Sequence, residues 1–506
     1  MIIVALATDL SQIVHVVRAP LDALRLLADA PAAWPLALAA GLLLFLVWWQ
    51  DRSGRTSPHW QHIAHALAWV GGLSILWWLF QGGRVPWDEG DWREEWGFFA
   101  AWKQALEAGS VPYYLRTVFY PIGSVLEGTE RYLANLQTPM VPYVLALKFI
   151  DVRWFFVFHI AVVYSAGFLG AVTLRRELGL ALLPWTMFLL IFTLNGHIVS
   201  HLSVGHVIWA AYFLTPWLLV CAIRISRGNQ SMRNVAACAA TLGAMMLVGG
   251  WQIFVCSVLF IIFTCLIPPR RITVLARIGS ITALLGAVKL APAVLTYGTG
   301  ANIFRGGYPS MGSLFAALVA SPTREGPLDP WEYDAYVGYV GFVLLCAGAV
   351  PFWQPAKRSL NLLLVPAFAL IVLSMGNVYE LTLFRLPGFV SQRVASRLIV
   401  LAILWLTLAG AVRFDPWWSR ARTSLVASVG VLLAVWFLAL QLLLRAHTWR
   451  PHIGPPLDAL PADVIKTAPV EPVYFWTFWC GAAVSTISAI VVARLLLSKE
   501  RVPATR

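Results

Sequence analysis

Apolar runs long enough to cross a membrane recur along the whole chain, and they limit its possible folds more than any other feature. Each run approaches the roughly 17–25 residues that cross the hydrocarbon core as an α-helix. A transmembrane β-strand would show about ten residues of alternating hydrophobicity, whereas these runs are solid apolar blocks. Only 12% of the 506 residues are charged, against about a quarter in a soluble domain. The chain is predicted to be an all-α, polytopic transmembrane helix bundle.

Hydropathy predicts about thirteen spans within a transmembrane domain of residues 34–497. The predicted spans are residues 34–50, 62–82, 154–174, 180–196, 203–223, 234–249, 252–267, 274–295, 336–356, 360–376, 397–413, 423–446 and 473–497. Residues 1–33 are predicted to be an N-terminal interfacial segment, part of which alternatively inserts as an extra span. Residues 139–150 are apolar but too short to cross alone, so a re-entrant or interfacial piece is expected there.

Arginine and lysine cluster in every second connection, which is the positive-inside pattern. This pattern places the tail, residues 498–506, in the cytoplasm. It places four long connections outside: residues 83–153, 296–335, 377–396 and 447–472. The side of the N-terminus depends on the exact number of spans. Topology bias also explains the net charge of +13, so the expected partner is the lipid bilayer and not nucleic acid.

The first outer connection is unusually acidic, because eight of the 24 acidic residues fall within residues 83–138. Asp88 and Glu89 directly follow a predicted span. A carboxylate held beside apolar surface tends to have a raised pKa, which suits a general base. Asp88 is the first candidate, and a solvated loop is the alternative for both acids. Asp91 is a further candidate, although Glu94 three residues later also suggests that Asp91 caps a helix.

An amphipathic helix is predicted over residues 92–108. Trp92, Trp96, Phe99 and Trp102 recur on one face at helical spacing. This aromatic face is expected either to lie on the membrane surface or to pack against the ends of other spans.

Three histidines, His197, His201 and His206, follow one predicted span and are expected at the outer surface. His197 and His201 are four residues apart, so a helix places them on one face. With carboxylates from the first outer connection they form a candidate site for a divalent cation. The alternative is interfacial histidines that bond backbone or lipid headgroups. The six cysteines lie in or beside spans, so neither a disulfide framework nor a zinc site is predicted.

Arginines on the outer side run against the charge bias and need an explanation. Arg305, Arg393 and Arg397 lie in outer connections or at span edges. They are candidates for bidentate phosphate recognition, or they pair with acids such as Asp88 or Glu332. Lys289 lies within a span, where a charge is costly and often functional. Its alternative is snorkelling to the interface.

Several segments, taken in order, resemble the GT-C superfamily of polytopic glycosyltransferases, and most closely its YfhO-like group of bacterial membrane proteins. The acidic pair after a span is followed by the amphipathic outer helix. Then come EAGSVPYYL (107–115), LANLQTPMVPY (133–143), GH…W…PW (205–217), EYDAYVGYVGFVLL (332–345) and LPGFVSQRVASRLIVLAILWLTLAGA (386–411). The resemblance extends over residues 62–411. The order of these segments carries it, since no single motif is very specific.

The resemblance implies a glycosyltransferase that moves a sugar from a polyprenyl-phosphate donor to a glycan, lipid or protein acceptor. The reaction would take place at the outer face of the bacterial cytoplasmic membrane. An acid of the first outer loop would be the base, with Asp88 the best positional match and Asp91 the second. Gln137 and His206 lie in matched segments and are expected to bind substrate. A strict Asp-x-Asp signature is absent from residues 87–89, which leaves dependence on a divalent cation open.

Other readings of the same chain are a lipid-linked-sugar transporter or flippase, a surface-polysaccharide polymerase or ligase, and a non-catalytic cell-envelope assembly protein. A transporter should carry charges along the interior of several spans. A polymerase or ligase is expected to have its large outer loop between late spans. Here the spans are poor in charge and the largest outer connection comes early, which favours the transferase.

Overall fold

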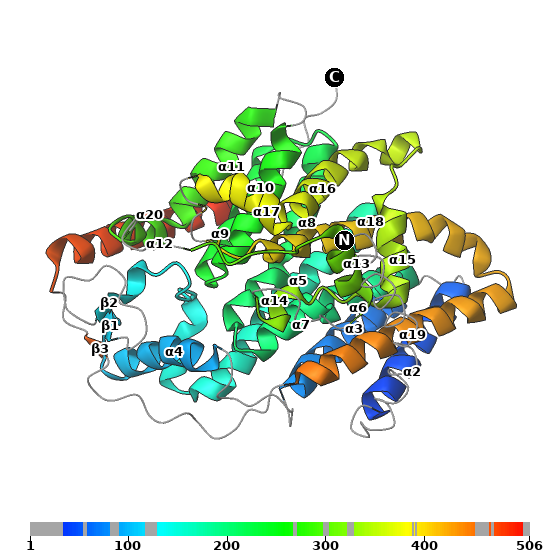
Figure 1. The fold of residues 1–506 in the computed structure, drawn as a ribbon, viewed down its shortest axis with the longest axis horizontal. Helices are drawn as coiled ribbons and strands as arrows, with labels where there is room; N and C mark the ends of the chain where they lie inside the picture. The colour runs from blue at the N-terminus through cyan, green and yellow to red at the C-terminus, as the bar shows by residue number, and fades with distance from the viewer. Residues whose placement is uncertain are drawn as a thin grey trace, which may run out of the picture.

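The computed structural model describes residues 34–53, 58–80, 91–116, 129–266, 271–296, 303–320, 328–386, 389, 392–450, 465–466 and 470–498. The predicted interfacial segment 1–33 and the acids Asp88 and Glu89 lie outside these ranges. Within them the fold is a helix bundle with three short strands (Figure 1).

Among the described residues, fifteen α-helices lie in or beside the apolar runs. They are α2 (Trp34–Ser53), α3 (Pro58–Leu79), α5 (Val152–Leu178), α6 (Leu182–Leu194), α7 (Gly196–Ser203), α8 (Thr215–Ser226), α9 (Met232–Leu247), α10 (Trp251–Leu266), α11 (Ile272–Leu285), α12 (Ala287–Val294), α15 (Gly338–Ala349), α16 (Leu364–Leu373), α18 (Ile399–Ala421), α19 (Leu425–Trp449) and α20 (Pro472–Leu497). Short helices in the connections are α4 (Trp92–Glu107), α13 (Met311–Val319), α14 (Pro330–Tyr333) and α17 (Gly376–Leu381). There are also 3-10 helices, including η3 (Pro142–Lys148), η4 (Val207–Leu214) and η6 (Pro355–Leu363).

Each predicted span contains at least one helix, and some are divided between two. Eight helical stretches among the described residues are long and apolar enough to cross a membrane, and a bent pair raises this number to nine. That pair is α11 and α12, which meet at an angle of 81°, so predicted span 274–295 is broken. α9, α10 and α15 are apolar but shorter. A polytopic helical membrane protein is confirmed, while thirteen crossings stay a prediction.

The four connections predicted to be outside meet at one end of the bundle, here called the outer end. β1 (Tyr114–Arg116) pairs antiparallel with β2 (Thr129–Arg131) and also with β3 (Ile465–Lys466), so the first connection reaches the last. Arg131 and Glu471 form an ion pair across the same junction. A β-bridge from Gly306 to Val394 joins the remaining two connections. Because these contacts link residues far apart in sequence, they support the predicted separation of sides.

The connections predicted to be cytoplasmic also contact one another, at what is here called the inner end. The buried Asp51 carboxylate accepts the backbone N–H groups of Leu182 and Leu183 and the Trp418 indole N–H. Arg271 donates to the Ser226 carbonyl oxygen at 3.1 Å. α5 leads from the outer end to the inner end with 27 residues, about 40 Å of helix.

α6 with α7, and α18, are the most enclosed membrane-length helices, whereas α20 is the most exposed of them. Figure 1 shows α20 at the periphery, beside α12. The enclosed helices carry the polar residues of the candidate site towards the outer end.

Of the two alternatives for the aromatic helix, the structure has the packed one. Trp92 and Phe99 of α4 are fully buried. The Phe99 ring centroid lies 5.1 Å from that of Phe156 in α5. Lys103 on the other side of α4 donates to the carbonyl oxygens of Leu147 and Ile150, at the end of η3. The aromatic stripe therefore attaches the first outer connection to the bundle.

Candidate functional site

Asp91 lies at the start of α4 and turns its side chain away from that helix. The carboxylate makes no capping hydrogen bond, so the predicted capping box is wrong. Its Oδ2 instead lies 2.5 Å from His206 Nε2. The side chain is half exposed, whereas His206 is almost fully buried. Asp91 is thus an acid that faces solvent on one side and a buried imidazole on the other.

A glycine permits this approach. Gly205 has φ +106°, and a Cβ there would lie 2.5 Å from the Trp92 backbone nitrogen. The left-handed conformation favours glycine, and the close contact excludes a side chain. The Asp91 N–H donates to Val204 at 2.8 Å. The His206 turn and the start of α4 are thereby held together.

Behind His206 the polar contacts continue into the bundle. His206 Nδ1 lies 2.6 Å from His201 Nδ1. His201 stacks on the Trp209 indole with ring centroids 3.9 Å apart, and its Nε2 lies 3.6 Å from Glu332 Oε2. Asp91, His206, His201 and Glu332 thus contact one another in this order and form what we call the polar chain.

Glu332 ends the polar chain in a bidentate ion pair with Arg397. Arg397 Nε donates to Glu332 Oε2 at 2.8 Å, and a terminal guanidinium nitrogen donates to Oε1. Burial opposes ionisation of Glu332, but the Arg397 charge and hydrogen bonds outweigh it and hold the pKa of Glu332 below its usual range. For Arg397 the structure therefore has the plainer of the two alternatives, pairing with Glu332.

The histidines are not at the lipid interface, contrary to expectation. His197 and His201 are fully buried on α7, because α7 extends α6 into the enclosed part of the bundle. His197 Nδ1 lies 3.0 Å from the Asp334 carbonyl oxygen. Within the described ranges, no group of three or more His, Cys, Asp or Glu side chains is arranged to hold a metal ion.

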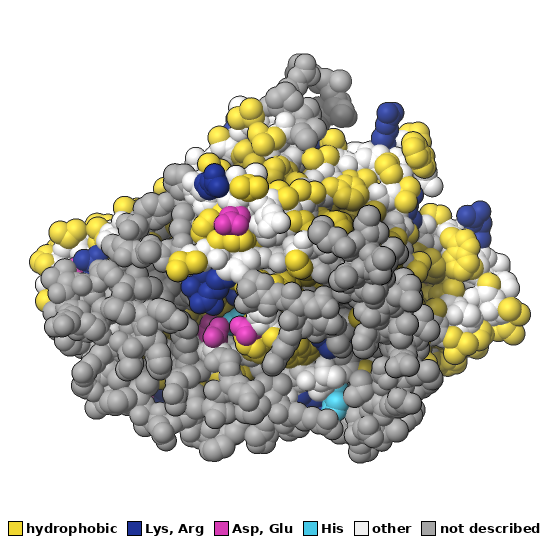
Figure 2. All heavy atoms as spheres, viewed as in Figure 1, with side chains coloured by type: hydrophobic (Ala, Val, Ile, Leu, Met, Phe, Trp, Pro, Cys, Tyr) yellow, Lys and Arg dark blue, Asp and Glu magenta, His cyan; other side chains and the backbone are white. Residues whose placement is uncertain are grey.

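Two further arginines, Arg305 and Arg393, lie near Asp91, the solvent-exposed end of the polar chain. Arg305 is exposed, and its backbone N–H donates to the Arg393 carbonyl oxygen at 2.9 Å. Burial favours neutral Asp91, but the hydrogen bond from His206 and the charges of Arg397 and Arg305 outweigh it and hold the pKa of Asp91 below its usual range. Figure 2 shows basic and acidic side chains gathered with a histidine near the middle of one face, where Figure 1 places α14.

Lys289 and Gln137 belong to a neighbouring region. Lys289 is fully buried, and its Nζ donates to the carbonyl oxygens of Leu136 and Met246 at 2.7 and 3.0 Å. It does not snorkel to the interface. The Gln137 N–H donates to Asn135 Oδ1 at 2.9 Å. Among the described residues, neither side chain is hydrogen-bonded to the polar chain.

A second buried acid was missed by the sequence reasoning. The fully buried Asp334 carboxylate accepts from Arg445 Nε at 2.9 Å and from the Trp449 indole N–H at 2.6 Å. The segment EYD (332–334) carries both acids that bind arginine from late helices. An acidic pair beside a span in a chain with few acids was the available signal.

The arrangement combines an ionised, half-exposed carboxylate with buried imidazoles and nearby arginines. It suits proton transfer at a site that also attracts an anion. The chain matches no protein-family model, no curated protein and no solved structure. The likeness to the GT-C superfamily accordingly stays a resemblance.

Proposed function

We propose that this protein is a membrane glycosyltransferase of the GT-C type, which uses a polyprenyl-phosphate sugar and has Asp91 as its general base. The observation that carries the proposal is the 2.5 Å contact between the half-exposed Asp91 carboxylate and buried His206. It lies where connections from distant parts of the chain meet. Asp91 takes the place of Asp88 as the leading candidate because its carboxylate contacts a buried imidazole and feels the charge of Arg305.

The proposed reaction is a displacement at the anomeric carbon of the donor sugar. The acceptor hydroxyl forms the new C–O bond, the bond to the carrier phosphate breaks, and the acceptor proton passes to the Asp91 carboxylate. Since the acceptor hydroxyl becomes acidic as the bond forms, an ionised carboxylate beside it is sufficient. Arg305 and Arg393 are suited to hold the departing phosphate. A divalent cation remains an alternative means of holding that phosphate.

The test is sugar transfer in membranes that contain the full chain, supplied with polyprenyl phosphate carrying a radiolabelled sugar. Asp91→Asn is expected to lower the transfer rate by about 100-fold or more, in line with the loss of a general base. Glu107→Gln is the matched control, because this exposed acid of α4 pairs only with Lys103 among the described residues. Full activity of the Asp91→Asn variant at normal expression would contradict the assignment.

Asp88→Asn and Glu89→Gln, tested in the same assay, distinguish a wrong choice of the general base from a wrong assignment of the transferase function. Loss of transfer with Asp88→Asn alone would keep the transferase and move the base to Asp88. Absence of transfer by the unaltered chain across glycan, lipid and protein acceptor fractions would contradict the transferase itself.

A lipid-linked-sugar transporter is the second candidate, favoured by one observation. The break between α11 and α12 bends the path by 81°, and Lys289 is buried three residues beyond it. Discontinuous helices with buried charge are typical of transporters. Movement of labelled lipid-linked sugar across reconstituted vesicles, without covalent transfer and unaffected by Asp91→Asn, would favour this candidate.

A further inference from the structure

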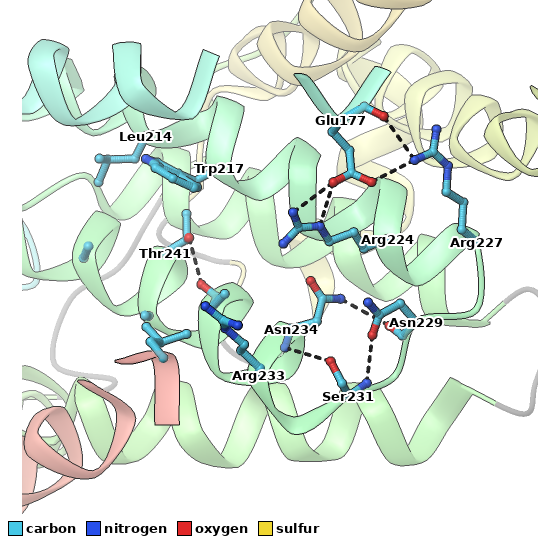
Figure 3. Close-up of a pocket in the computed structure, with 14 residues that line it drawn as sticks. Glu177, Leu214, Trp217, Arg224, Arg227, Asn229, Ser231, Arg233, Asn234 and Thr241 are labelled. Atoms are coloured by element: carbon cyan, nitrogen blue, oxygen red, sulfur yellow. Dashed lines mark hydrogen bonds and ion pairs between the residues drawn. The ribbon is translucent and has the colours of Figure 1, made fainter. Parts of the chain in front are cut away.

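A second polar site lies at the inner end of the bundle. Asp91 lies at the opposite, outer end. A pocket of about 900 Å³ opens between α5, α8 and α9, with Leu496 of α20 at its edge (Figure 3). Its charged side chains are Glu177, Arg224, Arg227 and Arg233. The polar chain does not contribute to it, and the proposed transferase reaction does not use it.

The charged part of the pocket is positive. Glu177 Oε2 accepts from Arg224 Nε at 2.9 Å, and Oε1 accepts from Arg227 at 2.8 Å. One carboxylate thus forms ion pairs with two guanidinium groups and balances only one of their two charges. Arg233, at the start of α9, makes no hydrogen bond or ion pair with any described residue. Figure 3 shows Arg224 and Arg233 on neighbouring helices that face the same space. The pocket is left with two positive charges for an anion.

One buried acceptor in this pocket also points to a ligand. Asn234 is almost fully buried, and its Oδ1 has no hydrogen-bond partner among the described residues. Its Nδ2 donates to the carbonyl oxygens of Asn229 and Cys221 at 3.2 and 3.5 Å. Turning the amide over would place its oxygen against those two carbonyls, so the assignment is fixed by its neighbours. A buried acceptor without a donor is costly, and a hydroxyl group would satisfy it.

The wall along α8 and α9 is mostly apolar and continues from the charged part. Its apolar residues are Leu214, Trp217, Ala237, Ala240, Ala244 and Leu496, and Thr241 is the polar residue among them. The alanines lie on one face of α9, where their small side chains leave room beside the helix. The pocket thus combines arginine side chains at its opening, a buried acceptor that a hydroxyl group can satisfy, and a largely apolar wall. Together these features fit one class of molecule.

We infer that this pocket binds an anionic glycerophospholipid with a hydroxylated headgroup, such as phosphatidylglycerol, from the cytoplasmic leaflet. The phosphate would lie between Arg224 and Arg233, a headgroup hydroxyl would donate to Asn234, and an acyl chain would lie along α9. Basic pockets between transmembrane helices on the cytoplasmic side are suited to anionic lipid headgroups. The positive-inside pattern places this end in that leaflet.

The test uses the full chain reconstituted in nanodiscs of mixed phosphatidylglycerol and phosphatidylcholine. Lipid retained after transfer to detergent is counted by native mass spectrometry. The unaltered chain is expected to retain phosphatidylglycerol in preference. Arg224→Gln with Arg233→Gln should reduce that retention by about tenfold or more. Arg277→Gln is the matched control, because Arg277 is an exposed arginine on α11 that does not line the pocket.

Ala240→Phe provides a variant that leaves every charge in place and fills the apolar wall. It is expected to reduce retention as the arginine variant does. Arg233→Gln alone keeps both ion pairs to Glu177, so a loss of retention there does not reflect a failure to fold. Equal retention of both lipids, or unchanged retention in all pocket variants, would overturn the proposal.

Two further binding measurements identify which chemical group of the ligand the pocket recognises. Inorganic phosphate that displaces the bound lipid at millimolar concentration would show a site for free phosphate and overturn the assignment to lipid. Phosphatidylmethanol has the same charge but no headgroup hydroxyl, so it is expected to bind more weakly than phosphatidylglycerol. Equal binding of the two would overturn the role of Asn234.

Discussion

At the scale of single residues, the hydrogen bond between Asp91 and His206 determines how the candidate base titrates. The contact helps to hold the pKa of Asp91 below its usual range. The carboxylate is therefore charged throughout the neutral range. Transfer that needs this charge should be lost only as the pH falls through the lowered pKa.

His206→Ala is expected to move the acid limb of the pH–rate profile to higher pH. Without the imidazole, burial still disfavours the charged carboxylate and less remains to oppose it, so the pKa of Asp91 rises. The measurement is the rate of labelled sugar transfer in membranes across the acidic range. His206→Gln keeps an amide donor and should shift the limb less. An acid limb at the same pH in all three proteins would contradict the role of His206.

Asp334 illustrates the opposite role of a carboxylate, which is to hold helices together. It is fully buried and binds Arg445 and Trp449 of α19. Removing one partner of a buried ion pair leaves the other charge uncompensated, which costs about 3–5 kcal/mol. Asp334→Asn should therefore lower the thermal unfolding temperature in detergent. Glu380→Gln, a change at an exposed acid of α17, should change it little. Equal unfolding temperatures would show that the pair contributes no stability.

At the scale of helices, α15 and α18 pack with their backbones almost in contact. A Cβ on Gly348 would lie 1.8 Å from the Leu406 carbonyl oxygen, and one on Gly410 would lie 1.9 Å from that of Leu344. Each glycine thus faces backbone of the other helix, which cannot rotate away. Small residues at helix interfaces allow this approach within a membrane, where no hydrophobic force drives helices together.

Gly410→Ala is expected to destabilise the bundle by about 1–3 kcal/mol, because the added methyl group must push α15 and α18 apart. The measurement is the midpoint of thermal unfolding of the purified protein in detergent. Gly430→Ala in α19 is the matched control, since no atom of the described residues lies within 4 Å of a Cβ there. Alanine favours a helix over glycine, so this control should be neutral or stabilising. A similar loss in both variants would indicate that helix propensity and not close packing is responsible.

At the scale of the whole molecule, the helices could be predicted well from the sequence. A helix that crosses a membrane must have a certain length and an apolar composition, and both are visible in the sequence as apolar blocks. The sequence did not predict that α4 is buried, because an aromatic stripe fits a membrane surface and a protein surface equally. It placed His201 at the interface, since hydropathy does not show that α7 continues α6. The contact of Asp91 with His206 joins residues 115 positions apart, and no local pattern encodes such a pairing.

The separation of the two ends makes a prediction about sidedness. Outer connections contact outer connections, and inner contact inner. One correct assignment of side therefore fixes the whole described chain. The positive-inside pattern predicts that the inner end faces the cytoplasm. Met311 lies exposed at the outer end and Thr423 exposed at the inner end, so each is suited to carry a single reactive thiol.

A membrane-impermeant maleimide applied to intact cells should label Met311→Cys and leave Thr423→Cys unlabelled until the membrane is permeabilised. The background needs serine in place of Cys346 and Cys480, which are the exposed cysteines. Because α13 and the turn between α18 and α19 are separated by the enclosed part of the bundle, reversed labelling would invert every connection together. It would place Asp91 in the cytoplasm and the pocket of Arg224 outside. Both proposals would then lose the membrane face on which each depends.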